Sequence, residues 1–184
     1  MQNITLTTAQ SIDDLQQILD LQQRNLRTQL AAVEIQEEGF VTVVHNLGLL
    51  AEMNHPHPHI ISKARDAVVG FALVMDRAYG DKIAVLKPMV EIINKCTYEG
   101  LSIGHARYII MGQICIAKAY RKQGLFRKMY SLMETRLKPF FDYIITEIDA
   151  KNTRSLQAHL HTGFKVLKRY DADNIEWVLV IKKI

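Results

Sequence analysis

The feature that most constrains this chain is the passage from residue 114 to residue 130, where an apolar segment leads through a short basic turn into an amphipathic helix. The turn contains Gly124, and the helix is expected to begin at Leu125. A helix that starts in this way directs backbone N–H groups, the positive end of its dipole and neighbouring cationic side chains to one place. Such donors suit a phosphate, so the passage predicts a site for a phosphate-bearing ligand.

Length and composition indicate one ordinary globular domain, which we expect to span residues 1–184. The chain is 48% hydrophobic and 23% charged, and its 184 residues can bury a core without disulfides. Its two cysteines, Cys96 and Cys115, form no CxxC motif. This usage is typical of proteins from a reducing, intracellular compartment.

Charge and hydropathy argue against two classes of partner. The net charge of +4 is small and the basic residues are scattered, so nucleic-acid binding is not indicated. No N-terminal segment resembles a signal peptide, and no segment approaches the roughly 20 apolar residues that span a bilayer. We therefore expect a cytoplasmic protein that binds neither nucleic acid nor a membrane.

Helical and strand patterns alternate along the chain, which indicates the α/β or α+β class. Ser11 and Asp14 form a capping box, and Gly163 is expected to end a helix. The segment 40–44 is compatible with a strand or a loop. Strands are expected at residues 4–8, 59–63, 67–75, 108–116, 143–148, 164–170 and 175–181, and helices after residue 11, at 47–53, near residue 88, at 125–137 and at 153–161.

Two common phosphate-binding motifs do not fit the basic turn. A P-loop would end in GKS or GKT, and a dinucleotide turn would read GxGxxG. The turn instead reads Arg121-Lys122-Gln123-Gly124-Leu125-Phe126, which matches the pattern Arg/Gln-x-x-Gly-x-Gly/Ala except at Phe126. Some thirty residues later, Asn152 opens a second segment that passes through Ser155 and closes at Gly163-Phe164.

These two segments, in this order and with a strand between them, resemble the GCN5-related N-acetyltransferase (GNAT) superfamily. The resemblance covers about residues 108–170. It implies a mixed, mostly antiparallel central sheet flanked by helices, with acetyl-CoA as the cosubstrate and no metal. The activity that it implies is transfer of the acetyl group to a primary amine, of a small metabolite or a peptide, by direct attack on the thioester.

The resemblance also assigns cofactor contacts. The backbone of Ile114, Cys115 and Ile116 would pair with the pantetheine amides like an added strand. Backbone N–H groups from Gln123 through Gly124 and Leu125 to Phe126 would bind the pyrophosphate, with added charge from Arg121 or Lys122. Asn152 is implied as a pantetheine contact, and Ser155 holds the adjacent small-residue position. Taken alone, the glycine turn is equally compatible with a surface turn before an ordinary helix.

Two residues near Asn152 are candidates for proton transfer. Glu147 resembles the glutamate that ribosomal-protein N-acetyltransferases carry at this place, so it is the candidate base, provided that burial raises its pKa. His159 stands where the family often has a tyrosine acid for the CoA thiolate. The alternatives are a strand carboxylate paired with a lysine and a helix-face histidine without a role. Tyr120, Tyr130 and Tyr143 are other candidate proton donors.

The acceptor and the assembly state stay open at this point. Residues 76–107 replace what is a tight hairpin in many relatives, and this insertion is expected to shape the acceptor site. His55, His57 and His59 alternate with prolines, but no cysteine or carboxylate cluster lies beside them, so no metal site is expected. A non-catalytic acyl-CoA-binding or sensory domain is the rival function. A homodimer is compatible with the sequence.

Overall fold

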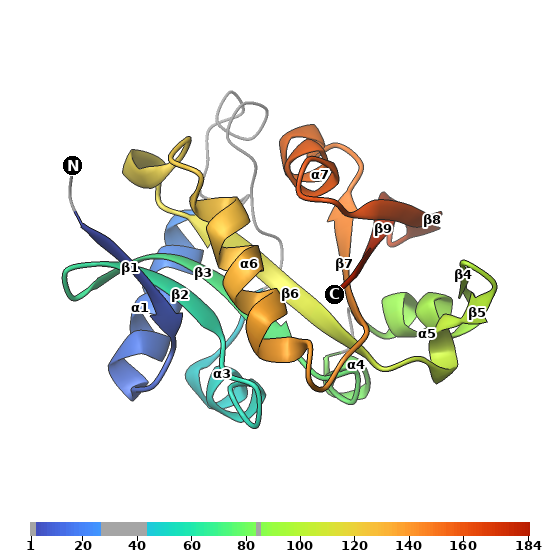
Figure 1. Cartoon of the computed structure of the whole chain (residues 1–184), viewed down its shortest axis with the longest axis horizontal. Coiled ribbons are helices and arrows are strands. Elements are labelled where there is room, and N and C mark those ends of the chain that lie inside the picture. Colours follow the sequence, from blue (N-terminus) through green and yellow to red (C-terminus); the bar gives the residue numbers. More distant parts are fainter. Residues whose placement is uncertain (1–2, 27–43, 84–85) are drawn as a thin grey trace.

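A long mixed sheet, bent where two of its strands separate, organises the molecule (Figure 1). The structure is a computed structural model, and it describes residues 3–26, 44–83 and 86–184. Within these residues the sheet has the order β1-β2-β3-β6-β7-β9-β8, in which β6 and β7 pair in parallel and the other neighbours pair antiparallel. The strands are β1 (Ile4–Thr8), β2 (Ile60–Ala64), β3 (Ala67–Met75), β6 (Tyr108–Ile116), β7 (Tyr143–Asp149), β8 (Lys165–Ala172) and β9 (Ile175–Lys183).

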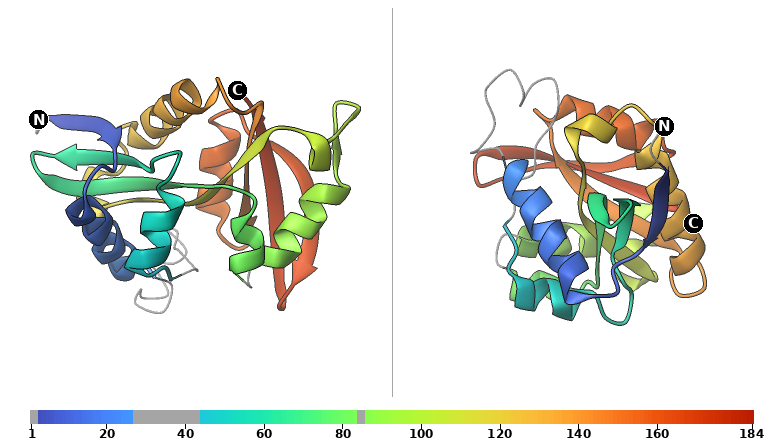
Figure 2. Two further views of the ribbon diagram at one scale, coloured as in Figure 1. Left: turned by 90° about the horizontal axis from the view of Figure 1, so that it is seen from below. Right: turned by 90° about the vertical axis from the view of Figure 1, so that its left-hand side faces the viewer.

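Helices cover both faces of this sheet. We call one side the α1 face, because α1 (Ile12–Arg24), α3 (Leu47–Met53) and α5 (Lys87–Lys95) bury their apolar side chains there. The other side is the α6 face, where α6 (Leu125–Leu137) and α7 (Thr153–Leu160) pack. Figure 2 shows α6 on one side of β1 to β3, with α1 and α3 on the other. In the described residues no helix is long and apolar enough to cross a membrane.

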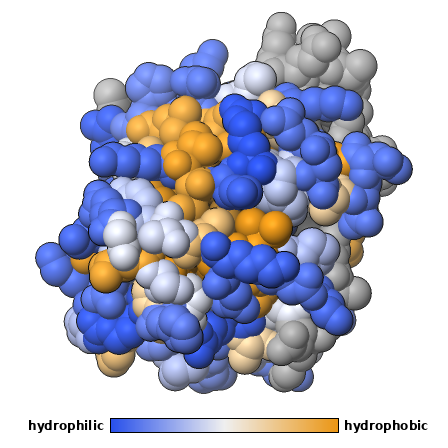
Figure 3. Space-filling model, turned by 90° about the vertical axis from the view of Figure 1, so that its right-hand side faces the viewer, coloured by the Kyte–Doolittle hydropathy of each residue, from blue (hydrophilic) through white to orange (hydrophobic). Residues whose placement is uncertain are grey.

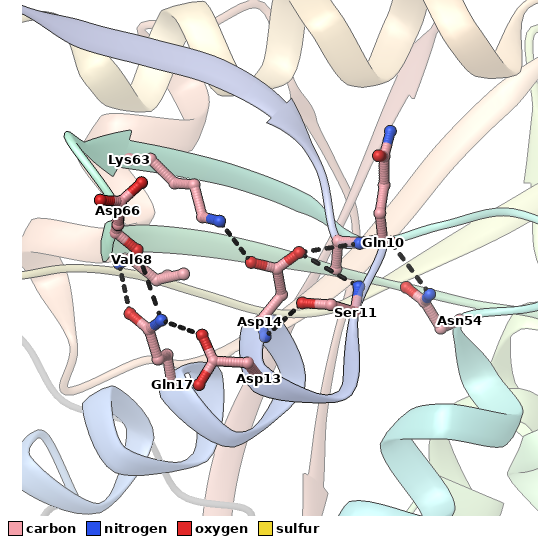
Figure 4. A network of polar contacts seen from close by, with 10 residues as sticks. Gln10, Ser11, Asp13, Asp14, Gln17, Asn54, Lys63, Asp66 and Val68 are labelled. Atoms are coloured by element: carbon pink, nitrogen blue, oxygen red, sulfur yellow. Dashed lines mark hydrogen bonds and ion pairs between the residues drawn. The ribbon is translucent and has the colours of Figure 1, made fainter.

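The start of α1 is held by the capping box that the sequence predicts (Figure 4). The Asp14 backbone N–H donates to the Ser11 hydroxyl at 3.1 Å, and the Asp14 carboxylate accepts from the backbone N–H groups of Gln10 and Ser11. Lys63 of β2 adds an ion pair at 2.6 Å. Burial alone would raise the pKa of Asp14, but Lys63 and the backbone donors hold it below its usual value. The first helix is thereby joined to the sheet.

The separation of β6 from β7 is the main irregularity of the sheet. The two strands pair only from Tyr108 opposite Tyr143 to Ile110 opposite Ile145. Beyond that point β7 continues against β9, whereas β6 continues against β3. In the described residues, the edge of β6 that faces β7 therefore has no strand partner over residues 111–116. Figure 1 shows the two strands diverging toward α6 and α7.

A β-bulge in β6 exchanges the two faces of the sheet on which the side chains after the bulge lie. Ala72 of β3 lies opposite Ile114 and Val74 lies opposite Met111, so β6 has one extra residue between these pairs. Gln113 consequently lies on the α1 face, where the side chain of Gln22 in α1 donates to it at 2.6 Å. Ile114 packs on the α6 face instead.

The described part of the insertion at residues 76–107 folds into short helices and a hairpin. It contains α4 (Tyr79–Lys82), α5, a hairpin of β4 (Thr97–Tyr98) and β5 (Leu101–Ser102), and a 3-10 turn at Ile103–His105. Met89, Ile93 and Ile103 are fully buried against the α1 face. Figure 3 shows this end of the molecule, where orange apolar side chains reach the surface between blue polar ones. The helix near Pro88 was expected, but the hairpin was not.

Most of the elements expected from the sequence are confirmed. The mixed, mostly antiparallel sheet flanked by helices is present, and the strands and helices lie within a few residues of their expected ranges. Gly163 follows α7 with a φ of 96°, as expected for a residue that ends a helix. The segment 40–44 lies outside the described residues, apart from Val44.

The histidines between the prolines do not converge on a metal. The His59 ring is buried, and it accepts at Nδ1 from the Val74 backbone N–H at 3.1 Å and donates from Nε2 to the Leu50 carbonyl at 3.2 Å. His57 instead packs its ring against Phe140 and Phe141, each with its centroid 5.0 Å away. In the described parts of the chain, no three histidine, cysteine or acidic side chains are arranged to hold a metal ion.

His159 lies in the core between α6 and α7. Its Nδ1 lies 2.7 Å from the Ser155 carbonyl, which can only accept, so Nδ1 carries the proton. Its Nε2 then accepts from the Tyr130 hydroxyl at 2.8 Å. Phe126 and Phe164 surround the ring with centroids 5.0 and 5.2 Å away. Burial lowers the pKa of His159 from 6.5 to about 4, so the imidazole is neutral at neutral pH.

This environment predicts a pH dependence of stability. Because the folded-state pKa of His159 is depressed, the unfolded chain binds one more proton between pH 6.5 and about 4, and the free energy of unfolding falls as the pH falls through this window. His159→Phe should remove this contribution. The slope of the free energy of unfolding against pH should then fall by up to about 1.4 kcal/mol per pH unit. It should also cost about 1–3 kcal/mol at neutral pH, because the Tyr130 hydroxyl loses its acceptor.

Denaturant unfolding of both proteins from pH 7.5 to 4 measures this difference. His161→Phe is the matched control for the change of side chain, since His161 lies two residues away on the exposed side of the chain. Equal slopes for wild type and His159→Phe would contradict the neutral, buried imidazole.

Candidate active site

A cavity of about 230 Å³ lies between the second half of β6, the turn after it, and the first turns of α6 and α7. The turn passes through a 3-10 segment at Lys118–Tyr120 before α6 begins. One residue that lines the cavity comes from the end of α1, and the others lie between residues 114 and 158. The lining residues are Asn25, Ile114, Cys115, Ile116, Tyr120, Arg121, Lys122, Gly124, Leu125, Phe126, Asn152, Arg154, Ser155 and Ala158. The cavity is therefore built around the passage that the sequence marks as a phosphate site.

The start of α6 offers its backbone to the cavity. Gly124 is the N-cap residue with a φ of 75°, and no side chain caps the helix. A Cβ placed on Gly124 would meet no atom within 4 Å, so open space lies beside the backbone there. Lys122 also has a positive φ, of 61°. Left-handed residues next to a helix N-terminus turn successive N–H groups to one side, which is the geometry of an anion nest.

The charged side chains that line the cavity within the described residues have one sign. They are the three cations Arg121, Lys122 and Arg154, and no carboxylate of the described ranges is among the lining residues. Arg121 has a further role, because its Nε donates to the Ile116 carbonyl and its Nη2 to the Asn25 side chain, each at 2.8 Å. It joins the end of β6 to the end of α1. The field in the cavity favours an anionic ligand.

The β6 wall combines an open backbone edge with inert side chains. Residues 114–116 line the cavity on the stretch of β6 that lacks a strand partner toward β7 within the described residues. Burial raises the pKa of the Cys115 thiol to about 11, so it stays protonated and packs as a small apolar group. The wall can therefore hydrogen-bond an extended ligand through its backbone.

The α7 wall is fixed by its own N-cap. The Asn152 side-chain oxygen accepts from the Ser155 backbone N–H at 3.2 Å, and both residues line the cavity. The ring of Phe126 turns toward His159 and Tyr130, with centroids 5.0 and 5.2 Å away. The Phe126 side chain thus packs between the helices while its backbone stays at the start of α6.

Glu147 lies on the other face of the sheet, where β7 has already separated from β6. Tyr143 and Ile145 of the same strand pack on the α1 face, and Glu147 follows them in register. The Tyr170 hydroxyl of β8 donates to its Oε2. Burial raises the pKa of Glu147 to about 7, although the Tyr170 hydrogen bond acts in the opposite direction. A carboxylate with this pKa can accept a proton near neutral pH.

The structure brings together ten of the eleven residues expected to contact a cofactor. The exception is Gln123, whose side chain donates to the Ala119 carbonyl and does not line the cavity. Neither Glu147 nor His159 is among the lining residues. The hydrogen bonds of His159 do not match the acid role expected from the sequence, because one ring nitrogen donates to a carbonyl and the other accepts from Tyr130.

Four lining residues were not expected as cofactor contacts, although Tyr120 was named as a candidate proton donor. Ala158 lies three positions after Ser155, so helical spacing could have identified it. Arg154 shares the first turn of α7 with Ser155. Its positive charge, of the same sign as that of Arg121 and Lys122 before α6, could have identified it. Asn25 and Tyr120 carry no comparable signal, because their place in the cavity depends on how α1 packs and on the 3-10 segment.

Several solved structures share this arrangement of elements. NAA60 from Arabidopsis thaliana, in complex with acetyl-CoA, has a TM-score of 0.65 at 11% identity, and the match covers 99% of this chain and 100% of that one. The NatC complex bound to Gag peptide and CoA has a TM-score of 0.64 at 12% identity, with 99% of each chain covered. A GNAT-family acetyltransferase from Streptococcus pneumoniae has a TM-score of 0.62 at 11% identity, again with 99% of each chain covered.

No protein-family model matches the sequence, and no curated protein matches it either. The likeness is therefore one of architecture, and it extends over the whole chain. This protein has the fold of the GCN5-related N-acetyltransferases.

Proposed function

We propose that the protein is an acetyl-CoA-dependent N-acetyltransferase that acetylates a primary amine. The observation that carries the proposal is the cavity at the separation of β6 and β7, with its uncapped helix start, three cations and open strand edge. Acetyl-CoA has the matching parts, namely a pyrophosphate, an amide-bearing pantetheine arm and a thioester at the end of that arm. NAA60 is described with acetyl-CoA and the NatC complex with CoA, in the same fold.

The cofactor would lie along these features in order. The pyrophosphate would accept from the N–H groups at the start of α6, beside Lys122 and Arg154. The pantetheine amides would pair with the backbone of residues 114–116, as a strand added between β6 and β7. The thioester would then reach the point where the strands meet, which is where β6 has its bulge and Glu147 follows on β7.

The chemistry then requires a neutral amine. Glu147, directly or through a water molecule, would take one proton from the ammonium group of the acceptor. The amine nitrogen attacks the carbonyl carbon of the thioester, the C–S bond breaks, and the nitrogen gives up a second proton as the amide forms. That proton can neutralise the departing CoA thiolate. We propose no acid role for His159, because its ring nitrogens are engaged in the core.

The acceptor would approach from the α1 face, on which Glu147 lies. The insertion borders this face, since Tyr98 of β4 packs on Tyr143 with ring centroids 6.0 Å apart. A small metabolite and a peptide amine are both compatible with it. Two neighbours bear on this choice: the NatC structure contains a bound peptide, and another neighbour is named as a ribosomal-protein-S18-alanine N-acetyltransferase.

A non-catalytic acyl-CoA sensor is the second candidate, because the cavity accounts for cofactor binding without turnover. Release of CoA thiol upon addition of amines, followed with a thiol reagent, separates the two. Amine-dependent release supports the transferase. Binding of acetyl-CoA by calorimetry without release for any amine or peptide would favour the sensor.

The cofactor site predicts a charge effect at Gly124. Gly124→Asp and Gly124→Asn place side chains of equal size in the same open space, and both residues tolerate a positive φ. Only aspartate adds a negative charge where the pyrophosphate should lie. Calorimetry should show acetyl-CoA affinity at least tenfold lower for the aspartate variant than for the asparagine variant, about 1.4 kcal/mol. Equal acetyl-CoA affinities in two folded variants would contradict binding of the pyrophosphate at this turn.

The proposed base predicts a pH effect. Because the pKa of Glu147 is raised to about 7, the rate should rise with pH through that value as the carboxylate forms. Glu147→Gln should lower kcat by about 10²–10⁴ and remove this acid limb. Glu176→Gln is the matched control, since Glu176 lies on the neighbouring strand in an exposed ion pair with Arg169. If Glu147→Gln keeps the wild-type kcat and the acid limb of the pH profile, then solvent, and not Glu147, deprotonates the amine.

The insertion predicts an effect confined to the acceptor. Deleting it would remove Met89, Ile93 and Ile103 from the core, so a surface substitution is the better test. Leu101 in β5 is 56% exposed, and Leu101→Ala should raise the KM for the amine while leaving acetyl-CoA affinity unchanged. If steady-state kinetics show the same KM, the insertion has only the packing role that its buried residues indicate.

A further inference from the structure

One contact on the α1 face joins Glu147 to the last strand of the sheet. Tyr170 belongs to β8 and lies opposite Trp177 of β9, while Glu147 of β7 lies opposite Leu179 of the same strand. The hydrogen bond from the Tyr170 hydroxyl to the Glu147 carboxylate therefore crosses β9. Asp173 and Asn174, both with positive φ, form the turn between β8 and β9 and set the register that places Tyr170 there.

The contact uses only half of the carboxylate. Tyr170 donates to Oε2, and within the described residues it is the one hydrogen-bond partner of Glu147. The second oxygen, Oε1, is left to accept from a molecule that approaches the α1 face. An ammonium group or a water molecule could donate to it while Oε2 stays fixed by the phenol.

We infer that Tyr170 is a positioning residue, whose hydroxyl orients the Glu147 carboxylate and keeps it in the ionised form that takes a proton from the acceptor. The inference rests on the proposed role of Glu147 as the base. Tyr170 acts through Glu147 and need not touch the reacting atoms. A phenol is suited to this task, because it donates one hydrogen bond and carries no charge that would attract the carboxylate away from the substrate.

The protonation states agree with this geometry. Burial and the neighbouring Glu147 raise the pKa of Tyr170 above its usual value, so its hydroxyl remains a donor across the working range of pH. Burial pushes Glu147 toward its neutral form, and the Tyr170 hydrogen bond resists this change. Without the hydroxyl, the same burial would act unopposed and the carboxylate would ionise only at higher pH.

Within the described ranges, no charged group takes the place of the neutral Tyr170 hydroxyl. Only burial and Tyr170 displace the pKa of Glu147. Lys168 lies opposite Leu179, so β9 lies between it and Glu147, and its charge acts on Cys96 of the insertion. Among the described residues, the other groups that can titrate on this face include Tyr143 and Asp149 on β7, Tyr79, Cys96 and Tyr98 in the insertion, Tyr108 and Cys115 on β6, and His45 beside α1.

The experiment compares wild type, Tyr170→Phe and Tyr143→Phe by two readouts. The first is the carboxyl ¹³C shift of Glu147 against pH in the protein without substrate, assigned by its loss in Glu147→Gln. The second is the pH profile of kcat for amine acetylation. Tyr143 lies on the strand and face of Glu147 but makes no hydrogen bond to it, so Tyr143→Phe controls for loss of a hydroxyl.

The expected result is a coordinated shift. Tyr170→Phe keeps the ring and its packing, and it should raise the midpoint of the Glu147 titration by about one pH unit, a tenfold change in proton affinity. The acid limb of kcat should move up by the same amount, with kcat on the high-pH plateau within a few-fold of wild type. Tyr143→Phe should move neither.

Each other outcome overturns a separate statement. An unchanged midpoint in Tyr170→Phe overturns the positioning role. A midpoint that moves without the acid limb overturns Glu147 as the base, and the catalytic role of Tyr170 with it. If wild type shows no turnover with any amine, the proposed function fails, and the ¹³C titration alone then decides whether Tyr170 holds the carboxylate ionised.

Discussion

The separation of β6 from β7 is the constraint on which the rest of the site depends. Two parallel strands that begin paired and then part leave backbone donors and acceptors without their sheet partners, and buried groups of this kind must be satisfied by something else. The bulge in β6 allows the separation without loss of the pairing to β3, because the extra residue absorbs the change of direction. An extended ligand is the natural partner for an edge prepared in this way.

The same separation gives the site two sides. The cavity with its cations lies between β6, α6 and α7, whereas Glu147 lies on the α1 face beside Tyr170. A cofactor held from one side and an acceptor that approaches from the other would meet at the separated strands. Neither substrate then has to leave before the other enters, which suits direct transfer in a ternary complex. The proposed chemistry needs no covalent enzyme intermediate, and the inert thiol of Cys115 fits that expectation.

Local patterns in the sequence predicted much of this arrangement, and the limits of that prediction have physical causes. The passage from β6 through Gly124 into α6 is coded by neighbouring residues, so its geometry could be derived from propensity and spacing. His159 shows the opposite case. Its position in the second motif suggested an acid, but its chemistry is decided by Tyr130, which lies 29 residues away in sequence and contacts it only in the folded chain.

The remaining misses have similar origins. The hairpin of β4 and β5 depends on Glu99 and Gly100, a turn pair too short to stand out within an insertion without clear periodicity. For Gln123 the expectation concerns its backbone N–H and stays a prediction, while its side chain bonds locally to Ala119. Lys122 adopts a positive φ that its residue type does not predict, since lysine, unlike glycine or asparagine, rarely does so.

The hydrogen bond between Arg121 and Asn25 connects residues that are 96 positions apart. The cavity is thus completed by the first helix of the chain, although the motifs that identify it all lie in the second half. Occupancy of the cavity and folding of the N-terminal half are therefore thermodynamically linked. A ligand that binds only the complete cavity stabilises the whole chain by an amount set by its concentration relative to its Kd. Cofactor supply would in this way act on the lifetime of the protein as well as on its rate.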